Sequence, residues 1–348
     1  MSGIFETMRR YECEELHFRY DRQTGLRAIV AIHDTRLGQT TSGGVRLVDY
    51  PDEEAALADA LRLAQAMTYK CAASDAGLGG AKAVLWNRPE EKTPALLEAF
   101  GRFVLHLGGR FRTAVDFGLS HADGRIIKAV CPYVEGESAA EAGFDHEADT
   151  TALGLVTAME LAVRARLGRQ GLAGLTVAVQ GVGYVGGFLV ERLLAAGARV
   201  LAAEVDPAII ARLEREQPEV TLVPPEDLLA TPCDILAPCA LGGVLHPASI
   251  AKLGCAIICG AANNQLLEPE RDAALIQARG ILYLPDFIVN AGGIIQACVE
   301  LEQGTRDQAR QRARAIIGRN VQAILERQAA GVSPLAAAQE LVARALEV

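Results

Sequence analysis

The chain lacks an excess of positive charge, a long hydrophobic run and a paired-cysteine motif. Its 43 acidic residues outnumber 34 Lys and Arg, and the net charge is -9. An acidic chain gives no support for binding nucleic acid or an anionic membrane surface. No segment has the apolar length of a membrane-spanning helix, and the first residues lack the basic start and apolar core of a signal peptide. We therefore expect a cytoplasmic protein without nucleic-acid or membrane partners.

None of the eight cysteines belongs to a CxxC pair. Cys255 and Cys259 bracket a short apolar run that predicts a buried strand. We interpret the cysteines as buried reduced thiols and expect no metal site, with a zinc site as the alternative.

At 348 residues the chain is about twice the usual length of one domain, which predicts two domains. We expect an α/β protein with a first, mixed-sheet domain over residues 1–138 and a Rossmann-like domain over 139–329. A last helix over about 330–348 is expected to pack back on the first domain. In the first domain, strands are predicted at residues 26–32, 83–86 and 112–115, and helices at 52–67 and 93–107. Thr150 or Thr151 is predicted to cap a helix that runs to about Arg166.

A glycine-rich turn lies between a predicted strand at residues 175–180 and an apolar helix. Its sequence is Gly181-Val182-Gly183-Tyr184-Val185-Gly186. Glycines allow backbone amides to approach a pyrophosphate, and the helix N-terminus stabilises its negative charge. The alternative is a turn that needs glycine only for close packing.

Glu204 ends the next predicted strand, close to the spacing of about 20 residues expected for a ribose-binding carboxylate. A carboxylate accepts hydrogen bonds from a free 2′-hydroxyl and repels a 2′-phosphate, so NAD is favoured. Arg199 and Arg212 lie nearby in sequence and leave NADP open.

Two lysines and one aspartate, Lys70, Lys82 and Asp116, stand at the ends of regular elements in the first domain. A lysine becomes a general base only when burial or a second positive charge lowers its pKa. If Lys70 and Lys82 share a cleft, one can hold an anion while the other activates water, and Asp116 can exchange a proton with an amine. The ordinary alternative for a single lysine is a solvated surface position.

These residues lie in segments that resemble the amino-acid dehydrogenases acting on glutamate, leucine, phenylalanine and valine, and the leucine dehydrogenase branch most of all. Similar segments run over most of the chain. In the first half they include Gly43-Gly44-Val45-Arg46, Met67-Thr68-Tyr69-Lys70, Gly79-Gly80-Ala81-Lys82 and Thr113-Ala114-Val115-Asp116. In the second half they include Ala237-Pro238-Cys239-Ala240, Gly260-Ala261-Ala262-Asn263-Asn264 and Pro285-Asp286-Phe287-Ile288-Val289-Asn290.

The resemblance implies a reversible oxidative deamination in which an L-amino acid, NAD and water give a 2-oxo acid, ammonia and NADH. Lys82 would be the base that activates water, and Asp116 would exchange protons with the nitrogen. Substrate contacts would come from Lys70, Gly43, Gly44, Ser42, Asn264, Asn290, Ile294 and Ala297. Cofactor contacts would come from Thr151, Gly181, Gly183, Tyr184, Val185, Gly186, Glu204, Ala240 and Asn263. The resemblance also implies a homo-oligomer, a dimer or larger, built through the first domain.

The substrate stays open because parts of the chain depart from the family pattern. The segment Gln39-Thr40-Thr41-Ser42 is longer and more polar than expected, and Ala297 stands where a larger apolar residue is usual. Tyr184 replaces a commoner Asn, and residues 145–149 lack a Ser-Pro-rich segment. We expect leucine or valine as substrate, with phenylalanine or tryptophan as the alternative because a smaller residue makes room. An alternative of another class is a catalytically silent sensor of NAD or an amino acid.

Overall fold

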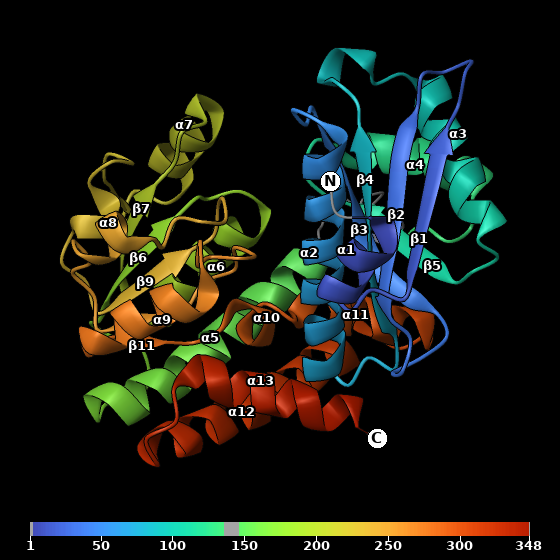
Figure 1. Cartoon of the computed structure of the whole chain (residues 1–348). Helices are drawn as coiled ribbons and strands as arrows, with labels where there is room; N and C mark the ends of the chain where they lie inside the picture. The colour runs from blue at the N-terminus through green and yellow to red at the C-terminus, as the bar shows by residue number, and fades with distance from the viewer. Residues whose placement is uncertain (1–2, 136–145, 348) are drawn as a thin grey trace. The chain divides into compact units, whose positions relative to one another are not determined.

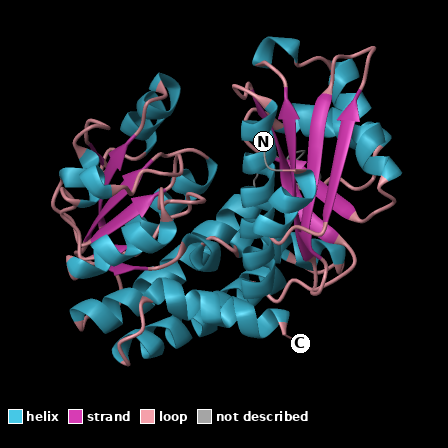
Figure 2. Cartoon of the chain, viewed as in Figure 1, coloured by secondary structure: helices cyan, strands magenta, loops and turns pink. Residues whose placement is uncertain are grey.

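The structure, a computed structural model, describes residues 3–135 and 146–347 of the chain (Figure 1). The chain divides into two compact units. The first comprises Met1–Phe144 with Ala345–Val348, and the second Asp145–Arg344. The predicted domain boundary at residues 138 and 139 lies outside the described residues. Each unit contains one β-sheet with helices beside it (Figure 2).

The first unit contains a mixed five-stranded sheet, as predicted. Its elements are α1 (Ile4–Arg10), β1 (Glu15–Tyr20), β2 (Arg27–Asp34), β3 (Thr41–Val48), α2 (Glu53–Ala73), β4 (Gly79–Trp86), η1 (Pro89–Glu91), α3 (Pro94–His106), β5 (Phe111–Val115) and α4 (His121–Val130). The strand order is β1-β2-β4-β3-β5. Strand β2 pairs antiparallel with β1 and β4, whereas β3 is parallel to β4 and β5.

Strand β4 sorts its side chains between the two faces of this sheet, because successive residues of a strand point to opposite sides. Ala81, Ala83 and Leu85 join a core with residues of α3 and α4. Val84 packs with Ala60 and Ala64 of α2 on the other face. Lys82 and Gly80 alternate with Ala81 and Ala83, so they share the face that α2 covers.

Helix α2 begins where the sequence predicts and continues further. Asp52 caps it by accepting a hydrogen bond from the backbone N–H of Ala55 at 2.8 Å. The predicted end near residue 67 is too early, because the helix continues to Ala73. Lys70 therefore lies in its last turn rather than after it.

The second unit contains a six-stranded parallel sheet of Rossmann-like order, which confirms the predicted fold class. Its elements are α5 (His146–Leu167), β6 (Thr176–Gln180), α6 (Tyr184–Ala195), β7 (Arg199–Ala203), α7 (Pro207–Glu216), β8 (Thr221–Leu222), η3 (Leu228–Ala230), β9 (Ile235–Pro238), α8 (Pro247–Ile250), β10 (Ile257–Ile258), α9 (Pro269–Ala278), β11 (Leu282–Tyr283), α10 (Asp286–Val289), α11 (Gly292–Leu301), α12 (Arg306–Ala329) and α13 (Pro334–Leu346). The order β11-β10-β9-β6-β7-β8 places later strands on both sides of β6. The order reverses between β6 and β9, and ligands of such sheets bind at that reversal, beyond the carboxyl ends of the strands.

One expectation about a helix in this unit needs correction. Thr150 and Thr151 do not cap a helix, because α5 already includes His146 and both threonines lie inside it. Acidic residues in its first turn, Glu147 and Asp149, suit this earlier start because they interact favourably with the helix dipole.

Helix α13 up to Arg344 groups with the second unit, whereas the chain from Ala345 groups with the first. That the last helix packs back on the first domain stays a prediction. Leu335 joins the core of that unit, and Glu340 forms an ion pair with Arg327 of α12 at 2.9 Å. None of the described helices is long and apolar enough to cross a membrane.

The close approach of α2 to β4 depends on Gly80. A Cβ at this position would lie 2.1 Å from the backbone N of Thr68 and 2.2 Å from its Oγ1. Gly80→Ala should therefore lower the free energy of unfolding by at least about 2 kcal/mol, because backbone atoms of α2 would have to move. Urea unfolding followed by circular dichroism measures this loss.

The matched control is Gly318→Ala on α12, where the added Cβ meets nothing closer than 3.8 Å. It should be neutral or stabilising by up to about 1 kcal/mol, because Ala favours a helix more than Gly does. A loss below about 0.5 kcal/mol in Gly80→Ala, the size of an ordinary surface substitution, would contradict the packing argument.

Candidate functional site

Lys82 and Asp116 form an ion pair that reaches across strand β3. Lys82 lies on β4, and Asp116 follows β5, on the far side of β3. Lys82 is only 7% exposed, and its Nζ donates a hydrogen bond to Asp116 Oδ2 at 2.5 Å. The structure thus brings together the two residues that the sequence predicts to be catalytic.

Gly44 of β3 leaves the space through which this pair forms. A Cβ at Gly44 would lie 3.1 Å from Lys82 Nζ and 3.0 Å from Asp116 Cβ. Any larger side chain would enter the gap between the lysine and the aspartate. The neighbouring Gly43 faces the other way, and a Cβ there would overlap the backbone oxygen of Ala81.

Arg46 is a second cation beside Asp116 that the sequence did not predict as part of the site. Its Nε lies 3.4 Å from Asp116 Oδ2, and its Nη1 lies 3.3 Å from Asp59 Oδ2. Asp59 also accepts a hydrogen bond from the Tyr50 hydroxyl at 2.6 Å. The alternation of side chains along β3 could have indicated Arg46, because Gly44 and Arg46 are two residues apart and therefore share a face of the strand.

The two cations set the charge state of Asp116. Burial alone would raise the pKa of this carboxyl, but the positive charges of Lys82 and Arg46 outweigh burial and hold its pKa well below the usual range. Asp116 is therefore a carboxylate at neutral pH. It can accept hydrogen bonds from an ammonium group.

Lys70 lies on the helix that covers the face bearing Lys82. It is partly buried, and its backbone oxygen accepts a hydrogen bond from Ser74 Oγ at 2.7 Å. Ser42, at the start of β3, is 6% exposed and pairs with Gly80 in the sheet register. The predicted substrate contacts of the first unit therefore lie on α2 and on β3, the strand beside β4.

In the second unit, the glycine-rich turn connects β6 to α6 at the reversal of strand order. Gly181 has a positive φ of 86°, and a Cβ on it would lie 2.7 Å from the Cβ of Ala240, which follows β9. A Cβ on Gly186 would lie 2.1 Å from the backbone oxygen of Gly181. Gly183, which caps α6, has open space where its side chain would be, and Tyr184 is 69% exposed. The turn fits the pyrophosphate of a dinucleotide, because the position of Gly183 at the N-terminus of α6 is open and helix N-termini favour negative charge.

Glu204 holds this turn against the end of β7. One carboxylate oxygen accepts a hydrogen bond from the N–H of Val182 at 2.7 Å. The other accepts from the N–H groups of Val205 at 2.7 Å and Asp206 at 3.1 Å. Glu204 thus stabilises the turn through hydrogen bonds, in addition to its predicted contact with ribose.

Two further predicted contacts are joined by a hydrogen bond. Asn290, 5% exposed, donates from Nδ2 to Asn263 Oδ1 at 2.9 Å and to the Ala261 oxygen at 3.0 Å. Asn264 has a positive φ of 52°, and its backbone oxygen accepts a hydrogen bond from Gly243 at 2.8 Å. The loops after β9 and β10 are thereby fixed to each other.

Helix α11 brings the remaining predicted residues close to α5. Thr151 donates from Oγ1 to the Glu147 oxygen at 2.8 Å. A Cβ on Gly293, at the start of α11, would lie 3.5 Å from Thr151 Oγ1. Ile294 and Ala297 follow on α11 and are 8% and 6% exposed.

Comparison with known proteins agrees with both halves of this arrangement. Residues 12–129 match the dimerisation domain of Glu/Leu/Phe/Val dehydrogenase, and residues 204–345 match the Glutamate/Leucine/Phenylalanine/Valine dehydrogenase domain. The chain belongs to this dehydrogenase family. The resemblance found in the sequence motifs is therefore confirmed, and so is the enzyme class, an amino-acid dehydrogenase that uses a nicotinamide cofactor.

Three relatives show how far the similarity to other members of the family extends. Leucine dehydrogenase from Geobacillus stearothermophilus is 41% identical over 88% of this chain and 83% of its own. Leucine dehydrogenase from Bacillus subtilis (strain 168) is 40% identical over 99% and 94%. The crystal structure of L-tryptophan dehydrogenase from Nostoc punctiforme superposes with a TM-score of 0.82 at 37% identity, with 99% of each chain covered.

Five of the eight cysteines of this dehydrogenase are buried, and Cys233, Cys239 and Cys255 are partly buried. Burial raises the pKa of Cys13 to about 11 and that of Cys239 to about 12. Over residues 3–135 and 146–347, no group of three or more His, Cys, Asp and Glu could hold a metal ion.

The low pKa of Asp116 predicts how stability depends on pH. A carboxyl group whose pKa is lower in the folded than in the unfolded chain stabilises the fold above its unfolded pKa of about 3.9. That contribution is lost as pH falls from about 5 through the low folded pKa. At pH 7, Asp116→Asn should cost about 1–2 kcal/mol, and the difference from wild type should shrink towards pH 3.5.

Urea midpoints measured at pH 7, 5 and 3.5 test this dependence. Asp307→Asn is the control, because it removes a carboxylate whose side chain is 85% exposed. The difference in stability between this variant and wild type should not shrink towards pH 3.5. A pH-independent difference for Asp116→Asn would show that the carboxylate's charge does not stabilise the fold.

Proposed function

We propose that this dehydrogenase catalyses the NAD-dependent, reversible oxidative deamination of an apolar L-amino acid, leucine or valine first, to the 2-oxo acid and ammonia. The observation that supports this most is the buried Lys82–Asp116 pair over Gly44, in a chain of the Glu/Leu/Phe/Val dehydrogenase family. A lysine and a carboxylate in direct contact can exchange protons with water and with an amine.

Lys82 is proposed as the base that activates water, and Asp116 as the group that exchanges protons with the substrate nitrogen. In the ion-paired state Lys82 carries a proton, which it must give up before it can act as a base. A substrate ammonium group would compete for the Asp116 carboxylate and so release Lys82 from the pair.

Lys70 is proposed to bind the substrate carboxylate, with help from the backbone of Gly43 and Gly44. An ammonium group near the end of α2 suits an anion. Asn264 and Asn290 are proposed to contact the substrate and the nicotinamide.

The cofactor is proposed to bind with its pyrophosphate at the glycine-rich turn and its ribose at Glu204. A bound nicotinamide would supply the acceptor for the hydride that leaves the substrate Cα. Glu204 favours NAD over NADP, because its negative charge repels a 2′-phosphate. Its hydrogen bonds to Val182, Val205 and Asp206 keep the carboxylate at the turn.

The side chain of the substrate is proposed to meet Ile294 and Ala297 of α11, which suit an apolar group. The alternative is an aromatic amino acid, favoured by the small side chain of Ala297 and by the similarity to L-tryptophan dehydrogenase. We also propose a homo-oligomer formed through the first unit, in line with the matched dimerisation domain. The cytoplasmic location stays a prediction.

A substrate panel tests this function. Initial rates of NADH formation at alkaline pH should give the highest kcat/KM for leucine or valine with NAD, and little turnover of glutamate or use of NADP. The reverse reaction should consume NADH with the matching 2-oxo acid and ammonium. Phenylalanine or tryptophan as best substrate would favour the aromatic alternative. Tight NAD binding without turnover of any amino acid would favour a silent sensor.

Lys82→Ala should lower kcat/KM by at least about 1000-fold, or about 4 kcal/mol of transition-state stabilisation, because it removes the proposed base. Lys92→Ala is the matched control: Lys92 also pairs with an aspartate of the first unit, Asp123, at 2.8 Å. It should keep activity within about twofold, as a partly exposed pair contributes little. Activity of Lys82→Ala within about tenfold of wild type would exclude the base role.

A further inference from the structure

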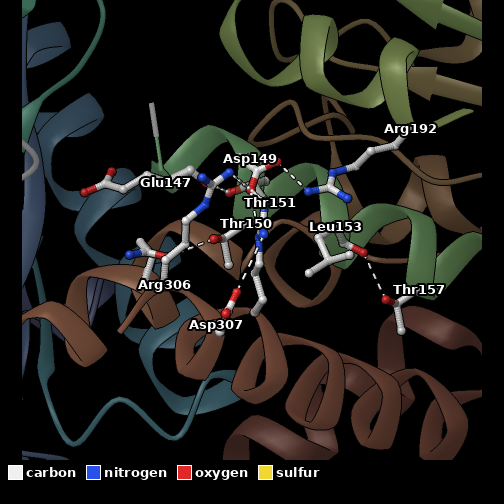
Figure 3. Close-up of polar contacts among 11 residues, drawn as sticks. Glu147, Asp149, Thr150, Thr151, Leu153, Thr157, Arg192, Arg306 and Asp307 are labelled. Atoms are coloured by element: carbon white, nitrogen blue, oxygen red, sulfur yellow. Dashed lines mark hydrogen bonds and ion pairs between the residues drawn. The ribbon is translucent and has the colours of Figure 1, made fainter. Parts of the chain in front are cut away.

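Asp149 of α5 binds three arginine side chains from two other helices (Figure 3). One carboxylate oxygen accepts a hydrogen bond from Arg192 of α6. The other accepts from Arg306 at 3.0 Å and from two nitrogens of Arg310 at 2.7 and 3.1 Å. Asp149 itself is 3% exposed. One buried carboxylate therefore ties the start of α5 to both α6 and α12.

The charge balance makes Asp149 the centre of this cluster. Three guanidinium groups contact the carboxylate of Asp149, and Asp307 makes a longer ion contact to Arg310, at 3.8 Å. Without the charge of Asp149, the three arginines would lose the partner that they share. The attachment of α6 and α12 to α5 would then be weaker.

The turn that contains Asp149 also contains Thr151, a proposed cofactor contact. Thr150, between them, donates from Oγ1 to Gln296 of α11 at 2.8 Å. Gly292, two residues after Asn290, packs so closely that a Cβ on it would lie 2.5 Å from Thr151 Cα. Thr151 is therefore near the chain segment proposed to contact the nicotinamide.

Arg192 links this turn to the other proposed cofactor contact. It lies on α6, the helix whose N-terminus follows the glycine-rich turn. The Asp149–Arg192 pair thus joins the helix that holds the pyrophosphate end of the dinucleotide to the turn near its nicotinamide end. The dinucleotide has to contact both places at once.

We propose that Asp149 is a positioning residue for cofactor binding: by binding Arg192, Arg306 and Arg310, it fixes Thr151 relative to the glycine-rich turn. The inference rests on the proposed function, because it takes those two places as cofactor contacts. Asp149 touches neither the substrate nor the cofactor in this scheme. It acts through the helices that it joins.

Calorimetric titration of full-length Asp149→Asn with NADH and with ADP-ribose tests the proposal. ADP-ribose contains the adenine half and the pyrophosphate but no nicotinamide, so it needs only the glycine-rich turn and Glu204. We expect the Kd for NADH to rise about tenfold, since misplaced contacts are costly, while the Kd for ADP-ribose stays within about twofold. Asp149→Glu, which keeps the charge, should recover part of the NADH affinity.

Two more variants complete the experiment. Asp307→Asn is the control, as it removes an exposed carboxylate near Arg310, and it should leave both Kd values unchanged. Arg192→Gln leaves Asp149 paired with two arginines and replaces Asp149→Asn in the experiment if that variant does not fold. The Kd of Arg192→Gln for NADH should rise about threefold, while its Kd for ADP-ribose stays unchanged.

An unchanged Kd for NADH in a variant whose Tm is lowered would show that Asp149 only stabilises the fold, and would overturn the proposal. Equal weakening of NADH and ADP-ribose would overturn it as well. These titrations need no turnover, so a protein that binds NADH but oxidises no amino acid would refute the proposed function and leave this inference standing. Wild-type protein that fails to bind NADH would refute the cofactor assignment itself.

Discussion

The missing side chain at Gly44 is the constraint on which the chemistry of the first unit depends. Strand β3 lies between β4 and β5, so a side chain of β4 reaches the end of β5 only by crossing β3. Lys82 makes that crossing through the space that Gly44 leaves, and ends at Asp116. An alanine there would already crowd both groups, because close-packed interiors have no spare volume.

In the second unit, glycines also allow neighbouring segments to approach closely, but the segments are arranged differently. Gly181 and Gly186 bring β6, α6 and the chain after β9 together where the strand order reverses. Hydrogen bonds, rather than large side chains, hold these segments in place. Glu204 accepts hydrogen bonds from three backbone N–H groups, and Asn290 donates one to the neighbouring loop. A dinucleotide site needs this combination, since it must be open to the ligand and still rigid.

The sequence predicts the elements well where the signal is local. Asp116 after a short strand, Glu204 after another and the glycine-rich turn before a helix all lie where the pattern places them. The two wrong helix bounds also have local causes. Helix α2 was predicted to end near Met67, although no helix-breaking residue follows directly. Thr150 and Thr151 resemble helix caps, but Glu147 and Asp149 already suit the first turn of a helix.

Arg46 and the arginines around Asp149 were not predicted for another reason. Their partners lie on other elements, and Arg306 is 157 residues from Asp149, so only the folded chain reveals which charges meet.

These charge clusters also show why the net charge of a chain says little about its sites. The protein is acidic overall, at -9, yet each of these two carboxylates contacts more than one cation. Asp116 faces Lys82 and Arg46, and Asp149 faces three arginines. Each carboxylate is partly shielded from water, where charge interactions are stronger than at the surface. The partners of each carboxylate come from other elements of the fold, so these contacts follow from the folded chain and not from its overall charge.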